Sequence, residues 1–109
     1  MSDLPLEISV EDLDRIRRDG EDHALLDVRE PHELEIISLS GSIDIPMGDV
    51  PERAAELPKD KTIAVLCRSG GRSLKITQWL RANGYHNATN VAGGINAWAE
   101  RIDNSLEPY

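Results

Sequence analysis

Residues 62–73 have the sequence Thr-Ile-Ala-Val-Leu-Cys-Arg-Ser-Gly-Gly-Arg-Ser, and the expected fold class follows from them. The first part, Thr62–Leu66, is apolar and rich in β-branched residues, which is typical of a strand buried on both faces of a sheet. The second part holds two glycines between two arginines and predicts a tight loop. A helix is expected from about Arg72 to Ala82, with Asn83-Gly84 as its C-cap.

The rest of the chain repeats this alternation of short strands and helices. Ser9 is the expected N-cap of the first helix, with Asp12 completing an approximate capping box. Because strands that alternate with helices form parallel sheets with helices on both faces, we expect a three-layer α/β/α domain with a five-stranded parallel sheet. The further strands are expected at Leu6–Ser9, His23–Val28, Ser42–Ile45 and Ala88–Val91, and the further helices from Ser9 to Gly20, from Pro31, from Pro51 to Glu56 and after Gly93-Gly94.

The length and charge of the chain limit its class. A chain of 109 residues holds one core, so a single domain over residues 1–109 is expected. Its 12 basic and 20 acidic residues give a net charge of −8, which argues against binding to nucleic acid or to an anionic membrane. The single cysteine excludes an internal disulfide and a cysteine-based zinc site. We expect no metal, no cofactor and a monomer.

No targeting or membrane segment is apparent. Residues 1–11 have neither a basic region nor an apolar core of the kind found in signal peptides. The longest apolar run, Ile63–Cys67, has five residues, far too few to cross a bilayer. A cytoplasmic location is therefore expected.

The loop after the strongest strand carries the candidate chemistry. A lone cysteine such as Cys67 is usually a small buried hydrophobe, but such a residue does not need two arginines and two glycines around it. The amino end of the following helix, the inward-pointing amides of a curled loop and the charges of Arg68 and Arg72 would each favour a thiolate. Cys67 is thus the expected nucleophile of an anion cradle that consists of Arg68, Ser69, Gly70, Gly71, Arg72 and Ser73.

Each cradle residue has an expected role. Arg68 is expected to face the substrate, and Arg72 to hold the loop closed by binding backbone carbonyls or a carboxylate. Ser69 either donates to the bound anion or fits the turn. Gly70-Gly71 shapes the backbone, and Ser73 is a candidate cap for the helix.

Charged residues also follow the strand at His23–Val28. Asp27 and Arg29 are candidates for the rim of the pocket. The alternative is an Arg29–Glu33 ion pair, with Asp27 accepting hydrogen bonds from loop amides, because buried charges are usually paired. The acidic residues of segment 30–35 form a solvated face or a docking surface for a basic partner.

Two reactions suit a thiolate in an anion cradle. Cysteine-dependent phosphatases have one more residue between Cys and Arg than the four found here, and they need an acid, for which Asp27, Glu30 and Glu33 are candidates. Sulfur transfer needs less, because the thiolate attacks a sulfane sulfur whose leaving group is already a stable anion. The product would be a persulfide on Cys67, without a general base.

Four segments resemble the signatures of the rhodanese family of sulfurtransferases over nearly the whole chain. The loop at Cys67–Ser73 resembles the active-site pattern Cys-Arg-x-Gly-x-Arg-Ser of that family. The other three are Asp27–Leu34, Gly41–Pro46 and Val91–Trp98. One departure is Ile37-Ser38-Leu39, which stands where the family usually has Gly-His-Ile and leaves local packing or partner contact open.

The resemblance implies a five-stranded parallel sheet and a thiosulfate sulfurtransferase, in which Cys67 accepts sulfur from thiosulfate or a protein persulfide and passes it to cyanide or a thiol. The tail from Trp98 to Tyr109 resembles the end of rhodanese domains fused to enzymes that activate ubiquitin-like sulfur carriers. The alternative is therefore a sulfur-carrier or docking module for cofactor or tRNA thiolation, with a cysteine desulfurase or a sulfur-carrier protein as partner. A phosphatase or arsenate reductase is the least favoured alternative.

Overall fold

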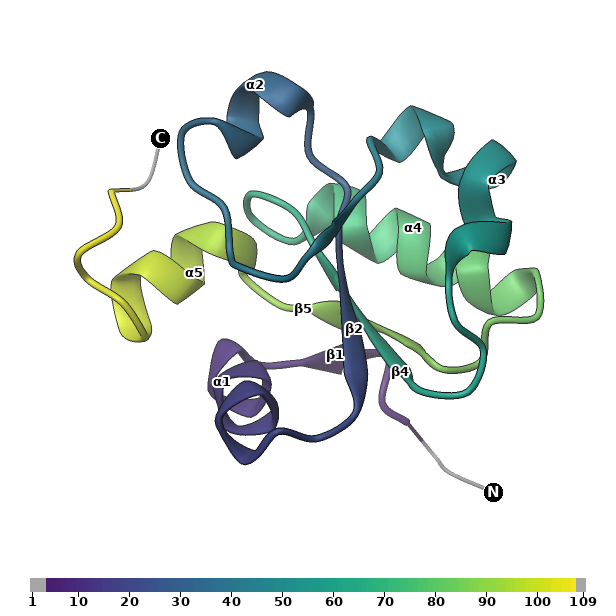
Figure 1. Ribbon diagram of the computed structural model, residues 1–109, viewed down its shortest axis with the longest axis horizontal. Helices are drawn as coiled ribbons and strands as arrows, with labels where there is room; N and C mark the ends of the chain where they lie inside the picture. The colour runs from purple at the N-terminus through teal and green to yellow at the C-terminus, as the bar shows by residue number, and fades with distance from the viewer. Residues whose placement is uncertain (1–3, 108–109) are drawn as a thin grey trace.

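A computed structural model, which describes residues 4–107, shows a five-stranded parallel sheet between helices (Figure 1). The sheet order β1-β5-β4-β2-β3 places β4 at the centre. This confirms the expected fold class. The strands are β1 (Glu7–Ile8), β2 (His23–Asp27), β3 (Ile43–Asp44), β4 (Thr62–Leu66) and β5 (Ala88–Val91).

The helices cover the two faces of the sheet in pairs. Helices α1 (Val10–Asp19) and α5 (Gly94–Arg101) pack on one face, and α3 (Val50–Arg53) and α4 (Gly71–Ala82) on the other (Figure 1). Helix α2 (Pro31–Leu34) follows the carboxyl end of β2. Short 3-10 turns at Met47–Asp49 and Ala54–Glu56 flank α3.

The side chains of β4 divide between the two core layers, as strand geometry requires. Ile63 and Val65 pack in the layer that contains residues of α3 and α4, whereas Ala64 and Leu66 pack in the layer that contains residues of α1 and α5. All four are fully buried, which explains why this strand has no polar face.

Helix α1 begins and ends as its sequence predicts. The Ser9 hydroxyl accepts a hydrogen bond of 3.0 Å from the amide of Asp12, and the Asp12 carboxylate accepts one of 3.3 Å from the amide of Ser9. Gly20 ends the helix in the left-handed conformation, with φ of 67°. Both caps were expected from residue type.

Several element boundaries differ from the prediction by one or two residues. The predicted strand Ser42–Ile45 is limited to Ile43–Asp44, although the Ile45 amide still donates to the carbonyl of Asp27 at 3.1 Å. The predicted helix Pro51–Glu56 begins at Val50 and changes to a 3-10 turn at Ala54. The segment Ile37-Ser38-Leu39, which departs from the usual Gly-His-Ile, is part of the core. Ile37 and Leu39 are buried in the same core layer as residues of α5, so the departure does not disturb local packing.

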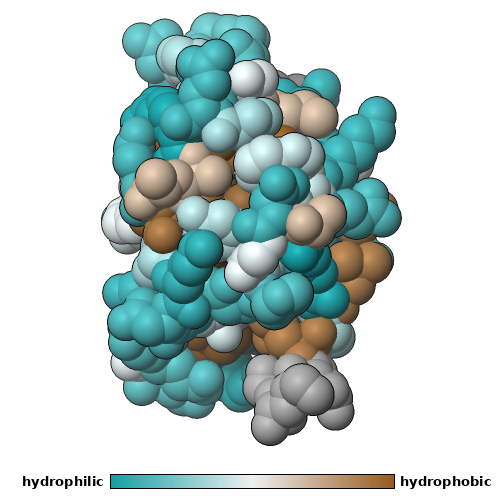
Figure 2. Space-filling model, turned by 90° about the vertical axis from the view of Figure 1, so that its right-hand side faces the viewer, coloured by the Kyte–Doolittle hydropathy of each residue, from teal (hydrophilic) through white to brown (hydrophobic). Residues whose placement is uncertain are grey.

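The surface holds few large apolar side chains. Figure 2 shows the side of the molecule that carries α3, where hydrophilic residues predominate and hydrophobic ones form small separate groups. Leu6 and Ile36 are the large hydrophobic residues exposed in segment 4–107. None of the helices in that segment is long and apolar enough to cross a membrane. Of the tail, Leu106 packs against the core layer of α1 and α5, while Pro108 and Tyr109 lie outside the described residues.

Candidate active site

Cys67 lies directly after β4, at the centre of the carboxyl edge of the sheet. Its side chain is almost fully buried, and its Sγ atom accepts hydrogen bonds from the Gly70 amide at 3.1 Å and from the Ser73 hydroxyl at 3.2 Å. Two donors that converge on one sulfur favour the thiolate over the thiol. Of the predicted cradle residues, Gly70 and Ser73 donate directly to the sulfur.

Ser73 has a different position from the predicted helix cap. Helix α4 has Gly70 as its N-cap, and the left-handed φ of 106° at Gly70 places the start of the helix at Gly71. Ser73 consequently lies in the first turn, fully buried, with its hydroxyl donating to Cys67. The prediction of a capping role was wrong because the loop turns into the helix earlier than expected.

The pKa of Cys67 reflects two opposing influences. Burial raises the pKa of the thiol, since a charge in an apolar environment loses hydration. The hydrogen bonds from the Ser73 hydroxyl and from the amides of Ser73, Gly70 and Ser69 lower it, and together they outweigh burial. The pKa of Cys67 thus lies below that of an ordinary thiol. The amide of Ser69 takes part, while its side chain is exposed.

The two arginines of the loop occupy different positions. Arg68 is exposed at the surface, and its substrate-facing role stays a prediction. Arg72 is half-buried and forms two hydrogen bonds with the Glu33 carboxylate, of 2.7 Å and 2.9 Å. This is the carboxylate-bound strut that was expected of Arg72. Because its charge is balanced by Glu33, Arg72 contributes more to the shape of the loop than to its positive field.

Glu33 is the residue that sequence analysis misplaced. Segment 30–35 was expected to be a solvated face, but the side chain of Glu33 is only 9% exposed. Helix α2 follows β2, the neighbour of β4, so the carboxyl ends of these strands bring Glu33 and Arg72 together. Two predictions together could have identified Glu33 as this partner. Arg72 was expected to bind a carboxylate, and the parallel sheet places the residues after β2 beside the loop after β4.

Asp27 and Arg29 lie beneath the site and not on its rim. Both side chains are fully buried, and Arg29 Nη2 is 2.8 Å from Asp27 Oδ2. Asp27 also accepts a hydrogen bond from the Arg29 amide, and Arg29 donates to the carbonyl of Ile37 at 2.6 Å. The rim interpretation was wrong because a buried guanidinium must be paired. The alternative interpretation predicted that Asp27 accepts hydrogen bonds from loop amides, and the bond from the Arg29 amide agrees with it. It also predicted an Arg29–Glu33 ion pair, but the carboxylate that pairs with Arg29 is that of Asp27.

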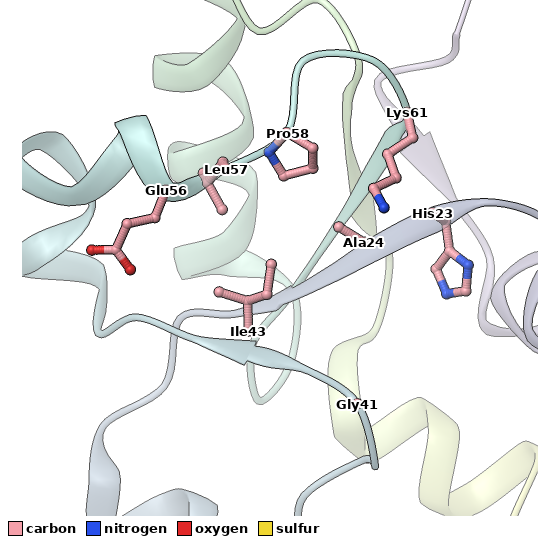
Figure 3. A pocket seen from close by; sticks show the side chains of 8 residues that line it. All are labelled: His23, Ala24, Gly41, Ile43, Glu56, Leu57, Pro58 and Lys61. Atoms are coloured by element: carbon pink, nitrogen blue, oxygen red, sulfur yellow. The ribbon is translucent and has the colours of Figure 1, made fainter.

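A separate hollow lies at the opposite, amino end of the strands. Its volume is about 390 Å³, and Ala24, Ile43, Leu57 and Lys61 are among the residues that line it (Figure 3). Lys61 lies 3.4 Å from the carboxylate of Asp22. The hollow contains none of the cradle residues, so it is not part of the candidate site. No cluster of three or more residues suited to bind a metal occurs within the described range 4–107.

The chain is similar to proteins of one family over most of its length. The model of the rhodanese-like domain family matches residues 9–101. A sulfurtransferase of Allochromatium vinosum is 39% identical over 93 residues, covering 85% of this chain and 87% of that protein. The crystal structure of a rhodanese-related protein from Thermoplasma volcanium is 35% identical with a TM-score of 0.80, covering 90% of this chain and 94% of that one.

A larger relative has a similar domain. The maize protein "Adenylyltransferase and sulfurtransferase MOCS3-2" is 34% identical over 109 residues, which cover 94% of this chain. The chain spans only 23% of the length of that relative. The likeness to domains of this kind, expected from the tail, is therefore confirmed at the level of sequence. Since the family model covers most of its length, the chain belongs to the rhodanese-like domain family.

Proposed function

We propose that this protein is a sulfurtransferase in which Cys67 carries the sulfur as a persulfide. The observation that supports this most directly is the arrangement of donors around Cys67 Sγ, with the Gly70 amide at 3.1 Å and the Ser73 hydroxyl at 3.2 Å. Donors so placed stabilise an anionic sulfur, both as the attacking thiolate and as the persulfide that replaces it. Relatives named as sulfurtransferases support the same activity.

With thiosulfate as donor, the reaction proceeds in two steps. The Cys67 thiolate attacks the outer sulfur of thiosulfate, a new S–S bond forms, and sulfite leaves with the electron pair of the broken bond. A nucleophile then attacks the terminal sulfur of the persulfide, and the Cys67 thiolate is the leaving group. With cyanide as nucleophile, the product is thiocyanate. Neither step needs a proton donor, which suits a site built of amides and hydroxyls.

The structure gives less support to a phosphatase. A phosphatase needs a protonated acid to assist the leaving alcohol. Of the three candidates, Asp27 is paired with Arg29, and Glu33 is paired with Arg72. Both carboxylates are buried and bound to a guanidinium group, so neither is placed to approach a leaving alcohol. Glu30 is exposed to solvent, and its amide donates to the Glu33 carboxylate at 3.0 Å.

A partner-dependent module remains the second candidate, and the likeness to the maize protein favours it. In this case Cys67 would receive sulfur only from a protein persulfide, such as that of a cysteine desulfurase, and would pass it to a sulfur-carrier protein. Exposed acidic side chains near the site, including Glu30 and Glu35, suit a basic partner. A cytoplasmic location and a monomeric state are parts of the proposal in both forms.

Intact-mass spectrometry tests the proposal. The reduced protein is exposed briefly to thiosulfate, beside Cys67→Ala as the matched control. A gain of one sulfur, about 32 Da, that occurs only in the wild type and disappears with cyanide is expected. If no adduct forms with thiosulfate but one forms with a persulfide-loaded desulfurase, the partner-dependent function replaces the first. Absence of an adduct with both donors would contradict sulfur transfer.

A further inference from the structure

The amino end of α5 lies directly against the cysteine loop. The amide of Ile95 donates to the carbonyl of Cys67 at 2.9 Å, and the amide of Asn96 donates to the carbonyl of Arg68 at 3.0 Å. The first amides of a helix have no partner within the helix, so they are available for such bonds. Two consecutive carbonyls of the loop are thus held by a helix that contributes no side chain to the cradle.

These two bonds also determine where the loop amides point. A trans peptide unit is planar, and its carbonyl and amide hydrogen point in opposite directions. The carbonyl of Arg68 and the amide of Ser69 belong to one such unit. When the carbonyl is held towards α5, the Ser69 amide is turned to the other side, and the next amide of the loop, that of Gly70, donates to Cys67 Sγ at 3.1 Å.

Gly94 allows this close approach. A Cβ atom at this position would lie 2.4 Å from the carbonyl oxygen of Cys67 and 2.6 Å from the carbonyl carbon and oxygen of Arg68. All three atoms are backbone atoms, so no side chain can move aside to make room. The close contact exists only because residue 94 has no side chain.

We propose that the amino end of α5 is a positioning element for the cysteine loop, in which Gly94 permits the contact and the Asn96 amide holds the Arg68–Ser69 peptide so that the following Gly70 amide reaches Cys67 Sγ. The proposal deepens the proposed function, because it assigns the reactivity of the sulfur partly to residues outside the loop. Gly94 and Asn96 act through the loop and touch no substrate.

The first test compares Gly94→Ala with Gly20→Ala. Both glycines have positive φ, 59° and 67°, so alanine suffers similar backbone strain at either position. A Cβ atom at Gly20 meets nothing within 4 Å, whereas one at Gly94 meets the loop. The measured quantity is the pH midpoint of Cys67 alkylation by iodoacetamide. We expect it to rise by about one pH unit in Gly94→Ala, as for loss of one hydrogen bond to a charged group, and to stay unchanged in Gly20→Ala.

A second pair of variants serves if Gly94→Ala does not fold. Asn96→Pro removes the amide hydrogen that binds the Arg68 carbonyl, at a first-turn position where helices tolerate proline. Asn96→Ala removes the same side chain but keeps the amide. We expect the alkylation midpoint to rise in Asn96→Pro and to match the wild type in Asn96→Ala, with both proteins folded by circular dichroism.

The alkylation test of the positioning role does not depend on whether the protein transfers sulfur. Unchanged alkylation midpoints in folded Gly94→Ala and Asn96→Pro would overturn the positioning role, even if the wild type forms a persulfide. An equal rise in Asn96→Ala would also overturn it, because the effect would then come from the side chain. If the midpoints move as expected but no persulfide forms with any donor, the proposed function fails and the positioning role stands.

Discussion

The guanidinium of Arg72 and the carboxylate of Glu33 face each other in two parallel hydrogen bonds of 2.7 Å and 2.9 Å, although 39 positions separate them in the chain. This pair joins α2 to the first turn of α4 and so braces the cysteine loop. Bidentate geometry of this kind restricts direction as well as distance. The loop is thereby held from one side by Glu33 and from another by the amino end of α5.

Glu33→Gln is expected to destabilise the protein by about 2 kcal/mol, because the half-buried Arg72 loses its two bonds to the Glu33 carboxylate. Urea unfolding measures this loss. The matched control is Glu56→Gln, which breaks a pair with Arg53 whose side chains are 51% and 42% exposed. Exposed pairs contribute little, so the control should be close to the wild type. Equal losses in the two variants would contradict the bracing role of Glu33.

Ser73→Ala is expected to raise the pKa of Cys67, since the Ser73 hydroxyl is the largest of the influences that lower it. The pH midpoint of alkylation should rise by about one unit, which corresponds to one hydrogen bond to a charged group. Thr77→Ser, in the next turn of α4, preserves the hydroxyl bond to the Ser73 carbonyl and serves as control. A midpoint that did not move in folded Ser73→Ala would show that the amides alone set the pKa.

The lowered pKa of Cys67 also predicts a pH dependence of stability. Below the folded-state pKa the thiol is protonated in both states and contributes nothing. As pH rises from there towards the pKa of the unfolded thiol, about 8.5, only the folded state is ionised, so stability increases. The wild type should therefore gain stability relative to Cys67→Ala over this window in urea unfolding. A difference that is constant with pH would contradict the lowered pKa.

Asp27→Asn is expected to cost about 3 to 5 kcal/mol of stability, because the buried Arg29 would lose the Asp27 carboxylate. Thermal or urea unfolding measures the loss. The protein that remains folded should keep the wild-type KM for thiosulfate, since neither residue reaches the surface. A raised KM with unchanged stability would restore the interpretation of Asp27 and Arg29 as rim residues.

Arg68→Ala is expected to raise the KM for thiosulfate about tenfold, because we propose that the exposed cation next to Cys67 in the chain attracts the anion. Arg68→Lys should restore part of the loss, and added salt should reduce the difference between the variants. Lys61→Ala is the control, since Lys61 lines the hollow at the other end of the strands (Figure 3). An equal effect of Lys61→Ala would indicate general attraction of anions instead of a local role for Arg68.

Local patterns in the sequence predicted most of the fold. Thr62–Leu66 and Ala88–Val91 have their predicted bounds, and Ser9 and Gly20 cap α1 as expected. The loop could be placed because it follows a buried strand, and the carboxyl edge of a parallel sheet is where ligands bind. These features depend on residues close together in the chain, so the sequence is sufficient to identify them.

The partners of the charged side chains could not be predicted in the same way. Segment 27–33 contains three carboxylates and one guanidinium close together in the chain, and the sequence alone permits several pairings. The structure pairs Asp27 with Arg29 in the interior and leaves Glu33 for Arg72. Which pairs form depends on the direction of each side chain and on how deeply it is buried, and neither follows from spacing along a loop.

The sequence by itself determined the alternation of strands and helices, the central apolar strand and the position of Cys67 at its end. Only the tertiary structure decided that the Ser73 hydroxyl faces the sulfur and that Gly94 lies against the carbonyls of the loop. The physical reason is that secondary structure follows from periodicity and local backbone preference. The environment of a buried sulfur, by contrast, is formed by segments distant in the chain that meet only when the sheet and its helices pack together.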